Sequence, residues 1–191
     1  VNTEHSRINI AANARPNNSV GVNSIVVGYQ NTTDDNEGTT ALGANNQAYG
    51  NSGLAVGNEN YANGGAATAI GAGNEARAAA TVALGNKNNA NATSAVAVGN
   101  YNNQNYTKNS TSTTPKQAGN YSTAVGSYNA ALGDNSVSVG SMNTSHVADT
   151  ITIGQSNNAK TMGGISIGKN NLTDSADGNR NDTRRNHENS Q

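Results

Sequence analysis

The amino-acid sequence predicts an all-β fold, a solenoid of parallel coils that are each about 14 residues long. Three observations lead to this expectation. A short aliphatic triplet followed by glycine recurs at nearly constant spacing, an asparagine follows each of these glycines at a fixed distance, and the composition is poor in the large apolar side chains of an ordinary core. A repeat of this kind decides the fold before any single element is considered.

The composition limits both the core and the partners of the protein. The chain of 191 residues has no Phe or Trp, and 12% of its residues are charged, against roughly 25% in typical soluble domains. Asn, Gly, Ala, Ser and Thr dominate, so the chain is either disordered or packs its small residues in a regular, repeating structure. The formal net charge of −1 argues against a nucleic acid or an anionic membrane as partner, because both require a basic face.

The sequence carries no sign of a disulfide or of a membrane-spanning segment. The absence of Cys excludes disulfides and thiolate metal sites. No apolar run approaches the length of roughly 18 residues that indicates a transmembrane helix. The sequence begins at Val1 without the regions of a signal peptide, so we expect an export signal and a membrane anchor to lie outside it.

The aliphatic triplets end in ten glycines whose spacing is nearly constant. The successive intervals between them are 15, 14, 14, 14, 14, 27, 14, 14 and 14, and random drift in a low-complexity sequence would not produce seven equal values. A degenerate copy, INIA at residues 8–11, is expected to open the array and to be followed by a short insertion. The ten glycines are Gly28, Gly43, Gly57, Gly71, Gly85, Gly99, Gly126, Gly140, Gly154 and Gly168.

Each position of the repeat has its own chemistry. The residue before the glycine is aliphatic in all ten copies, the residue two before it is usually Ala, and the residue four before it is always small. The fifth residue after the glycine is often Ala. The third residue after the glycine is Asn in every copy, namely Asn31, Asn46, Asn60, Asn74, Asn88, Asn102, Asn129, Asn143, Asn157 and Asn171.

These positions favour strands and tight turns over a coiled coil, although the period of the repeat equals two heptads. Gly and Asn would each cost roughly 0.5–1 kcal/mol in a helix interior, whereas β-branched residues favour strands. We therefore expect coils of two short strands and two tight turns, in which the glycine and the asparagine supply positive φ or turn conformations. The asparagines are expected to form a hydrogen-bonded ladder. Eleven coils about 4.8 Å apart would make a rod roughly 50 Å long.

The strand pattern also predicts an oligomer. Side chains alternate between the two faces of a strand, so in VAVG at residues 96–99 the two Val point one way and the Ala points the other. A solenoid that stands alone would need the alanine face to be polar, but Ala occupies it in six of ten copies and Val26 in a seventh. We expect one face to fill the coil interior and the other to meet another subunit. The alternative is that Ala is a tolerated small residue on a solvated face.

Several copies resemble the head repeats of the YadA-like trimeric autotransporter adhesins, which read approximately NSVAIGxxSxAxGxx. They are NSIVVG at residues 23–28, the run at residues 68–99, and NSVSVGSMNTS at residues 135–145, and the resemblance covers about residues 8–174. It implies a left-handed parallel β-roll, a homotrimer, and display on the outer membrane surface of a Gram-negative bacterium. It also implies attachment to host extracellular matrix, host cells or other bacteria.

This chain departs from the family pattern in ways that limit which family properties can be expected of it. The full NSV or NSI opening occurs only twice, and Asn replaces the frequent Ser after the glycine, so a specific ligand such as collagen is not carried over. We expect a head over residues 1–174 with an inserted loop at about 101–118. Residues 175–191 are expected to be a polar tail, disordered or leading to the helical neck that family members usually have.

The interval between Gly99 and Gly126 is nearly two periods long and predicts the candidate binding site. An insertion between coils has to leave the rod, and exposed loops on rigid scaffolds often carry recognition, with Tyr a preferred contact residue. The hypothesis is that this loop contributes to adhesion, and the alternative is a tolerated surface insertion. The candidate ligand-binding residues are Tyr101, Tyr106, Lys108 and Lys116.

No pattern in the sequence indicates an enzyme, a cofactor or a metal. Asp34, Asp35 and Glu37 lack EF-hand spacing, and no P-loop or dinucleotide fingerprint occurs. The three histidines lack metal-ligand spacing, and the N-x-S/T sequons are weak evidence of glycosylation in a chain so rich in these residues. These histidines and sequon asparagines are His5, His146, His187, Asn31, Asn91, Asn105, Asn109 and Asn120.

Three other classes of protein also have repetitive sequences. The left-handed β-helix acyltransferases follow a six-residue period with an active-site His, and neither is found here. An ice-binding solenoid would place Thr at one position of the repeat, but Thr is scattered over several. A trimeric phage-fibre segment, or a purely structural spacer without its own ligand, shares the repeat and remains an alternative.

Overall fold

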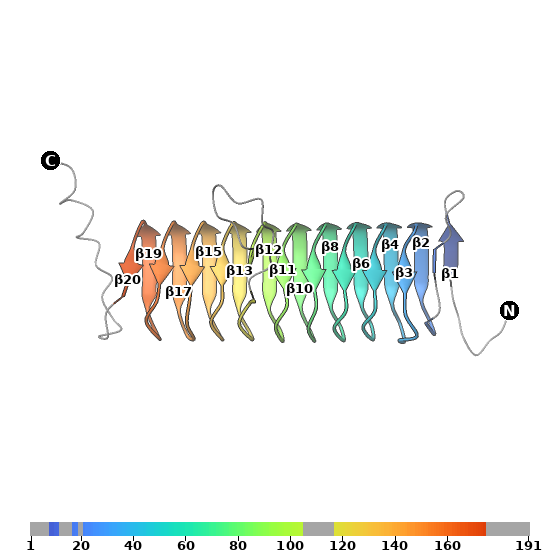
Figure 1. Ribbon diagram of the computed structural model, residues 1–191, viewed down its shortest axis with the longest axis horizontal. Helices are drawn as coiled ribbons and strands as arrows, with labels where there is room; N and C mark the ends of the chain where they lie inside the picture. Colours follow the sequence, from blue (N-terminus) through green and yellow to red (C-terminus); the bar gives the residue numbers. More distant parts are fainter. Residues whose placement is uncertain (1–7, 12–16, 19–20, 105–116, 175–191) are drawn as a thin grey trace.

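The protein is a parallel β-solenoid of about ten turns, as the computed structural model in Figure 1 shows. Equivalent positions of successive coils are in most cases 14 apart in the sequence, which confirms the predicted period. The structure describes residues 8–11, 17–18, 21–104 and 117–174. Each complete coil contributes a strand of five residues to one side of the solenoid and, in most coils, a strand of two residues to the other. All regular structure in the described ranges is β, and no helix there is long and apolar enough to cross a membrane.

The longer strands form one parallel sheet of eleven, in which the triplet of each coil pairs with the triplet of the next. The repeat glycines face one another in register, as Gly43 and Gly57 do. Ala11 faces Gly28, which confirms that INIA opens the array. The strands of this sheet are β1 (Ile8–Ala11), β2 (Ile25–Tyr29), β4 (Thr40–Ala44), β6 (Leu54–Asn58), β8 (Thr68–Ala72), β10 (Val82–Asn86), β12 (Val96–Asn100), β13 (Thr123–Ser127), β15 (Val137–Ser141), β17 (Ile151–Gln155) and β19 (Ile165–Lys169).

The short strands form two separate sheets on the other side of the coil. The first holds β3 (Thr32–Thr33), β5 (Gln47–Ala48), β7 (Tyr61–Ala62), β9 (Glu75–Ala76) and β11 (Asn89–Ala90). The second holds β14 (Ala130–Ala131), β16 (Thr144–Ser145), β18 (Asn158–Ala159) and β20 (Leu172–Thr173).

The two faces of the long strands are the reverse of what the sequence led us to expect. The residue two before the glycine, such as Ala55, Ala69 or Ala83, points into the coil and is fully buried. The larger Val, Leu and Ile on either side of it point outward. The reason is volume: the interior lies between a strand of five residues and one of two, and it holds mainly small side chains, with Val26 the largest apolar one. In the described coils there is therefore neither a solvated alanine face nor an alanine face left open for a partner.

The coil interior changes from apolar to hydroxyl-lined along the rod. The inward positions hold mainly Ala as far as Ala131, and beyond it Ser138, Ser145 and Thr152 replace Ala. The hydroxyl oxygens of Ser138 and Thr152 lie 2.8 Å apart, and each lies 3.1 Å from the hydroxyl oxygen of Ser145. These three buried hydroxyls satisfy one another and so avoid the penalty of burying an unpaired hydroxyl. Ser166 and Thr173 carry the next inward hydroxyls, which have no hydrogen-bond partner among the described residues.

The turn beside each repeat glycine is built from two residues with positive φ. The ten glycines have φ between 113° and 122°. The second residue after the glycine is also left-handed, with φ from 49° at Lys87 to 58° at Met142 among its non-glycine members. The asparagine that follows does not supply the positive φ, contrary to the expectation from sequence. Its side chain closes the turn by hydrogen bonding instead.

The repeat asparagines form a continuous buried column, of which Asn74 is typical. Its Nδ2 donates to the carbonyl oxygens of Ile70 (2.9 Å) and Gly85 (2.7 Å) and to Oδ1 of Asn60 (3.0 Å). Its Oδ1 accepts from the backbone nitrogen (3.0 Å) and Nδ2 (3.1 Å) of Asn88. Asn17 begins the column by accepting from the backbone nitrogen of Asn31 at 3.0 Å. The sequence did not reveal Asn17, because an insertion separates it from INIA.

The Gly71→Ala variant is expected to lose about 2–5 kcal/mol of unfolding free energy, because an alanine would adopt a left-handed φ and clash with the next coil. A Cβ at Gly71, where φ is +122°, would lie 2.0 Å from the carbonyl oxygen of Gly85. The matched control is Gly65→Ala, where no atom lies within 4 Å of the added Cβ. Thermal and denaturant unfolding measure both, and an equal loss in the two variants would contradict the explanation.

The Asn74→Ala variant is expected to lose about 3 kcal/mol or more, because it leaves several buried backbone groups without a partner at about 1 kcal/mol or more each. Asn63→Ala, which removes an exposed asparagine from the same region, is expected to change stability by less than about 0.5 kcal/mol. The measurement is the midpoint of chemical unfolding. Similar midpoints for the two variants would show that the column contributes little.

Candidate functional site

The long interval coincides with the break between the two short-strand sheets. The long sheet continues across it, because β12 pairs with β13 and Gly99 faces Gly126. On the other side, the first short sheet ends at β11 and the second begins at β14. The insertion therefore leaves the roll from the short-strand side. Residues 105–116 lie outside the described part of the chain, and the candidates Tyr106, Lys108 and Lys116 lie among them.

Tyr101, the remaining candidate of the loop hypothesis, lies in the turn that follows Gly99 and has φ of 54°. Its ring stacks on that of Tyr128 in the next coil, with centroids 5.2 Å apart and an interplanar angle of 12°. The Nζ of Lys87, one coil earlier, lies 5.4 Å from the centroid of Tyr101. The structure thus brings Tyr101 together with two residues that the sequence did not single out.

A second aromatic cluster lies on the outer side of the short strands, and the sequence did not predict it. The rings of Tyr49 and Tyr61 meet edge to face with centroids 5.6 Å apart, and the guanidinium carbon of Arg77 lies 4.7 Å from the centroid of Tyr61. The Nε of Arg77 donates to Glu75 at 2.9 Å. The members of this cluster stand four or six residues after their repeat glycines, and these positions are the sequence signal that could have predicted it.

The environment shifts two pKa values in this cluster. Burial raises the pKa of the Tyr49 hydroxyl, and Tyr61 and Asp34 raise it further by electrostatic repulsion of the phenolate. The hydrogen bond to Glu75 raises the pKa of the Arg77 guanidinium. Both shifts favour the protonated forms that tyrosine and arginine already have at neutral pH, so the cluster combines a neutral aromatic surface with a cation.

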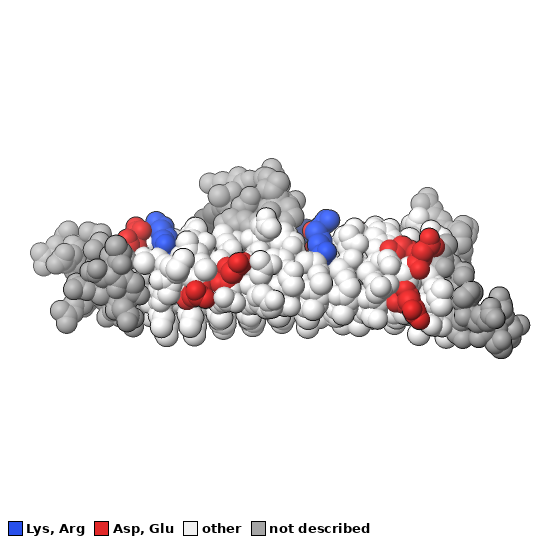
Figure 2. Space-filling view, turned by 90° about the horizontal axis from the view of Figure 1, so that it is seen from below, with Lys and Arg blue, Asp and Glu red and all other residues white. Residues whose placement is uncertain are grey.

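The long-strand side presents an aliphatic face to the outside. Exposure reaches 39% at Ile153 and 46% at Ile167, which is high for side chains of this size. Figure 2 looks onto the turns at the lower edge of the roll in Figure 1, and charged side chains are few and scattered on that side. The outward face, as we call it, comprises Ile25, Val27, Leu42, Leu54, Val56, Ile70, Val82, Leu84, Val96, Val98, Val125, Val137, Val139, Ile151, Ile153, Ile165 and Ile167.

The described residues hold no group of three or more His, Cys, Asp or Glu side chains that could bind a metal ion. In the acidic turn, Asp34 accepts hydrogen bonds from Asn36. Of the sequon asparagines, Asn31 is closed to modification because it is fully buried in the asparagine column, whereas Asn120 is exposed. Two more, at 105 and 109, lie outside the described residues, as do the histidines at 5 and 187.

Comparison with known families supports the assignment of these coils. The YadA head domain repeat matches residues 19–46, 35–60, 76–102 and 118–141. No curated protein matches the chain. The matches lie on coils on both sides of the insertion, and they include repeat glycines and asparagines that build the turns. Over residues 19–141 the chain is therefore a YadA-like head domain, and it belongs to the family of the YadA head repeats.

Proposed function

We propose that this chain is the head of a trimeric cell-surface adhesin that attaches a Gram-negative bacterium to host extracellular matrix, host cells or other bacteria. The outward face is the observation that carries the proposal: a rod of YadA head repeats presents an aliphatic stripe to its surroundings. The family and the solenoid fold are typically non-enzymatic. In the proposal the roll is left-handed, the head spans residues 1–174, and the tail at 175–191 leads toward an anchor outside this sequence.

The size of the outward face favours burial against other copies of the chain. Ten coils about 4.8 Å apart and a strand face about 10 Å wide give an area on the order of 500 Å². The largest apolar patch on a typical monomeric protein is about 300–600 Å² and is often functional, so a patch of this size marks an interaction surface. Two further copies, placed around a common axis, would cover this face and leave the short-strand side outward.

A trimer would repeat every weak contact of the short-strand side three times. The Tyr49–Tyr61–Arg77 cluster and the stems of the insertion lie on that side. Tyr and Arg are enriched among residues that dominate binding energy. Linked copies raise the overall affinity by orders of magnitude without new contacts, so a shallow surface suffices for adhesion.

The Leu84→Lys variant is expected to convert the trimer to monomers, because three ammonium groups would be buried near the axis without partners. Leu84 faces outward, so the single roll tolerates the change. Gln47→Lys, on the exposed short-strand side, is the matched control and is expected to keep the trimer. Light scattering gives the mass relative to the 19.3 kDa chain. A stable wild-type monomer would contradict the proposed trimer.

Deletion of residues 105–117 tests whether the inserted loop binds. It removes the excess over one period and gives Gly99 and Gly126 the spacing of the regular coils. We expect the oligomeric state and unfolding temperature to stay the same, and adhesion of head-coated beads to matrix or host cells to fall by at least about tenfold, because three copies are lost together.

Retained adhesion after this deletion would move the binding site to the Tyr49–Tyr61–Arg77 cluster or its surroundings. Arg77→Ala, made in both the intact and the deleted head, separates binding by the loop from binding by this cluster. Heads that fail to adhere to matrix, host cells and bacteria alike would favour the alternative of a phage-fibre-like or purely structural spacer.

A further inference from the structure

The backbone hydrogen bonds of the short-strand side follow a fixed pattern in regular coils. The nitrogen of Gln47 donates to the oxygen of Asn60 at 2.8 Å, and that of Tyr49 donates to the oxygen of Ala62 at 2.8 Å. In parallel strands the peptide groups of one coil hydrogen-bond to those of the coils on either side. An insertion that leaves the roll from this side takes peptide groups out of the stack and interrupts the pattern.

One side-chain amide bridges this interruption. Nδ2 of Asn103 donates to the carbonyl oxygen of Asn89 in β11 at 3.0 Å, and Oδ1 of Asn103 accepts from the backbone nitrogen of Ala131 in β14 at 2.9 Å. Asn103 is fully buried. The peptide unit of a strand directs its N–H to one neighbouring strand and its C=O to the other. The primary amide of Asn103 presents the same two groups, so it takes the place of a peptide in the ladder.

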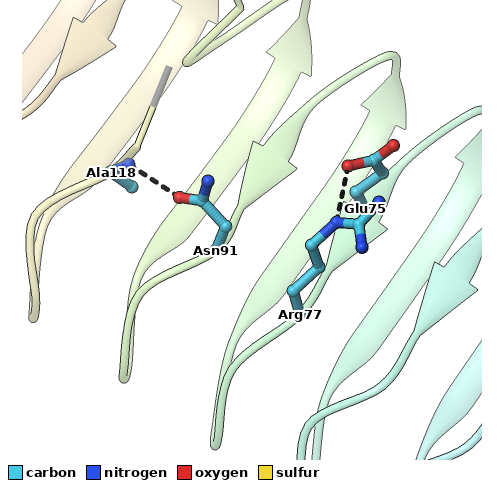
Figure 3. A network of polar contacts seen from close by, with 4 residues as sticks. All are labelled: Glu75, Arg77, Asn91 and Ala118. Carbon is cyan, nitrogen blue, oxygen red and sulfur yellow. Dashed lines mark hydrogen bonds and ion pairs between the residues drawn. The ribbon is translucent and has the colours of Figure 1, made fainter. Parts of the chain in front are cut away.

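A second asparagine holds the returning stem of the insertion. The Oδ1 of Asn91 accepts from the backbone nitrogen of Ala118 at 2.7 Å, as Figure 3 shows, and Arg77 lies one coil away. The next residue, Gly119, donates to the oxygen of Ala131 at 3.1 Å and so rejoins the regular pattern. Both stems are therefore held by the roll through side-chain amides.

We propose that Asn103 and Asn91 are positioning residues that make this point of the roll a display site for inserted loops. Asn103 substitutes for the peptide group that the insertion removes, and Asn91 captures the returning chain. The two stems are fixed by contacts within the roll, so the site accepts loops of unrelated sequence without loss of the β11–β14 connection. This inference does not depend on what the loop binds.

Asn89 provides a matched comparison for Asn103. Both stand four residues after a repeat glycine, in neighbouring coils, and both are fully buried. The side-chain amide atoms of Asn89 have no hydrogen-bond partner among the described residues, whereas those of Asn103 join two sheets. Repeat position and burial are thus shared, whereas the backbone conformation and the bridging differ: Asn89 lies in β11, and Asn103 has a left-handed φ.

The test is residue-resolved hydrogen exchange on the full chain in four variants. Asn103→Gly keeps the left-handed φ of 53° accessible and removes the amide. It is expected to raise the exchange rate of the Ala131 amide by at least about tenfold, with the Tyr49 amide, several coils away, as the internal reference. Asn89→Ala is expected to leave Ala131 unchanged. Asn91→Ala is expected to accelerate Ala118 alone.

The fourth variant replaces residues 105–116 by a Gly/Ser linker of equal length and is expected to leave the protection of Ala131 and Ala118 unchanged. The proposal is overturned if Asn103→Gly leaves the exchange of Ala131 unchanged relative to Tyr49, or if the linker exposes Ala131 as much as Asn103→Gly does. Should Asn103→Gly fail to fold, the Asn91→Ala result at Ala118 and the linker variant still decide it.

Discussion

The buried asparagine column is the interaction on which the rest of this solenoid depends. Each amide contacts its own turn, the preceding asparagine and the glycine of the following coil, so it fixes the stagger of three coils at once. The same contacts make the glycine obligatory, because a Cβ at Gly57 would lie 3.1 Å from Nδ2 of Asn60 and 2.1 Å from the next glycine oxygen. Glycine and asparagine therefore recur together, because the asparagine amide and the next coil leave no room for a Cβ at the glycine.

This constraint explains how a chain with so small an apolar interior forms a regular rod. The inward side chains are mostly Ala, which bury little surface compared with Leu or Phe. Hydrogen bonds between coils therefore contribute a larger share of the stability. The interior accordingly tolerates the replacement of Ala by Ser138, Ser145 and Thr152. The larger aliphatic side chains are placed outside, where a single chain gains little from them.

The sequence predicted the coil length, the parallel pairing and the asparagine contacts, because each depends on a residue type that recurs in every copy. It led us to expect the wrong face of the strand inside the coil. Alternation separates two faces but does not distinguish them, and that decision depends on the width of the coil. The left-handed residue of the turn was also misplaced by one position, since residues as different as Glu59, Lys87 and Met142 occupy it.

The surface features were harder to predict for a different reason. Tyr49, Tyr61 and Arg77 belong to three successive repeats and become neighbours only when the coils stack. Asn103 and Asn89 have the same residue type and repeat position, so their different roles follow from the insertion beside one of them. The candidate loop residue Tyr101 likewise gains its stacking partner, Tyr128, from the far side of that insertion.

The uniformity of the asparagine column has a genetic consequence. Every rung joins to the next through the same atoms, so the coils on either side of a removed or added repeat would meet with matching groups. Recombination between neighbouring repeats in the gene would then lengthen or shorten the rod by whole coils while each junction stays well formed. The reach of such a head could thus vary between lineages by copy number alone, without any new point substitution.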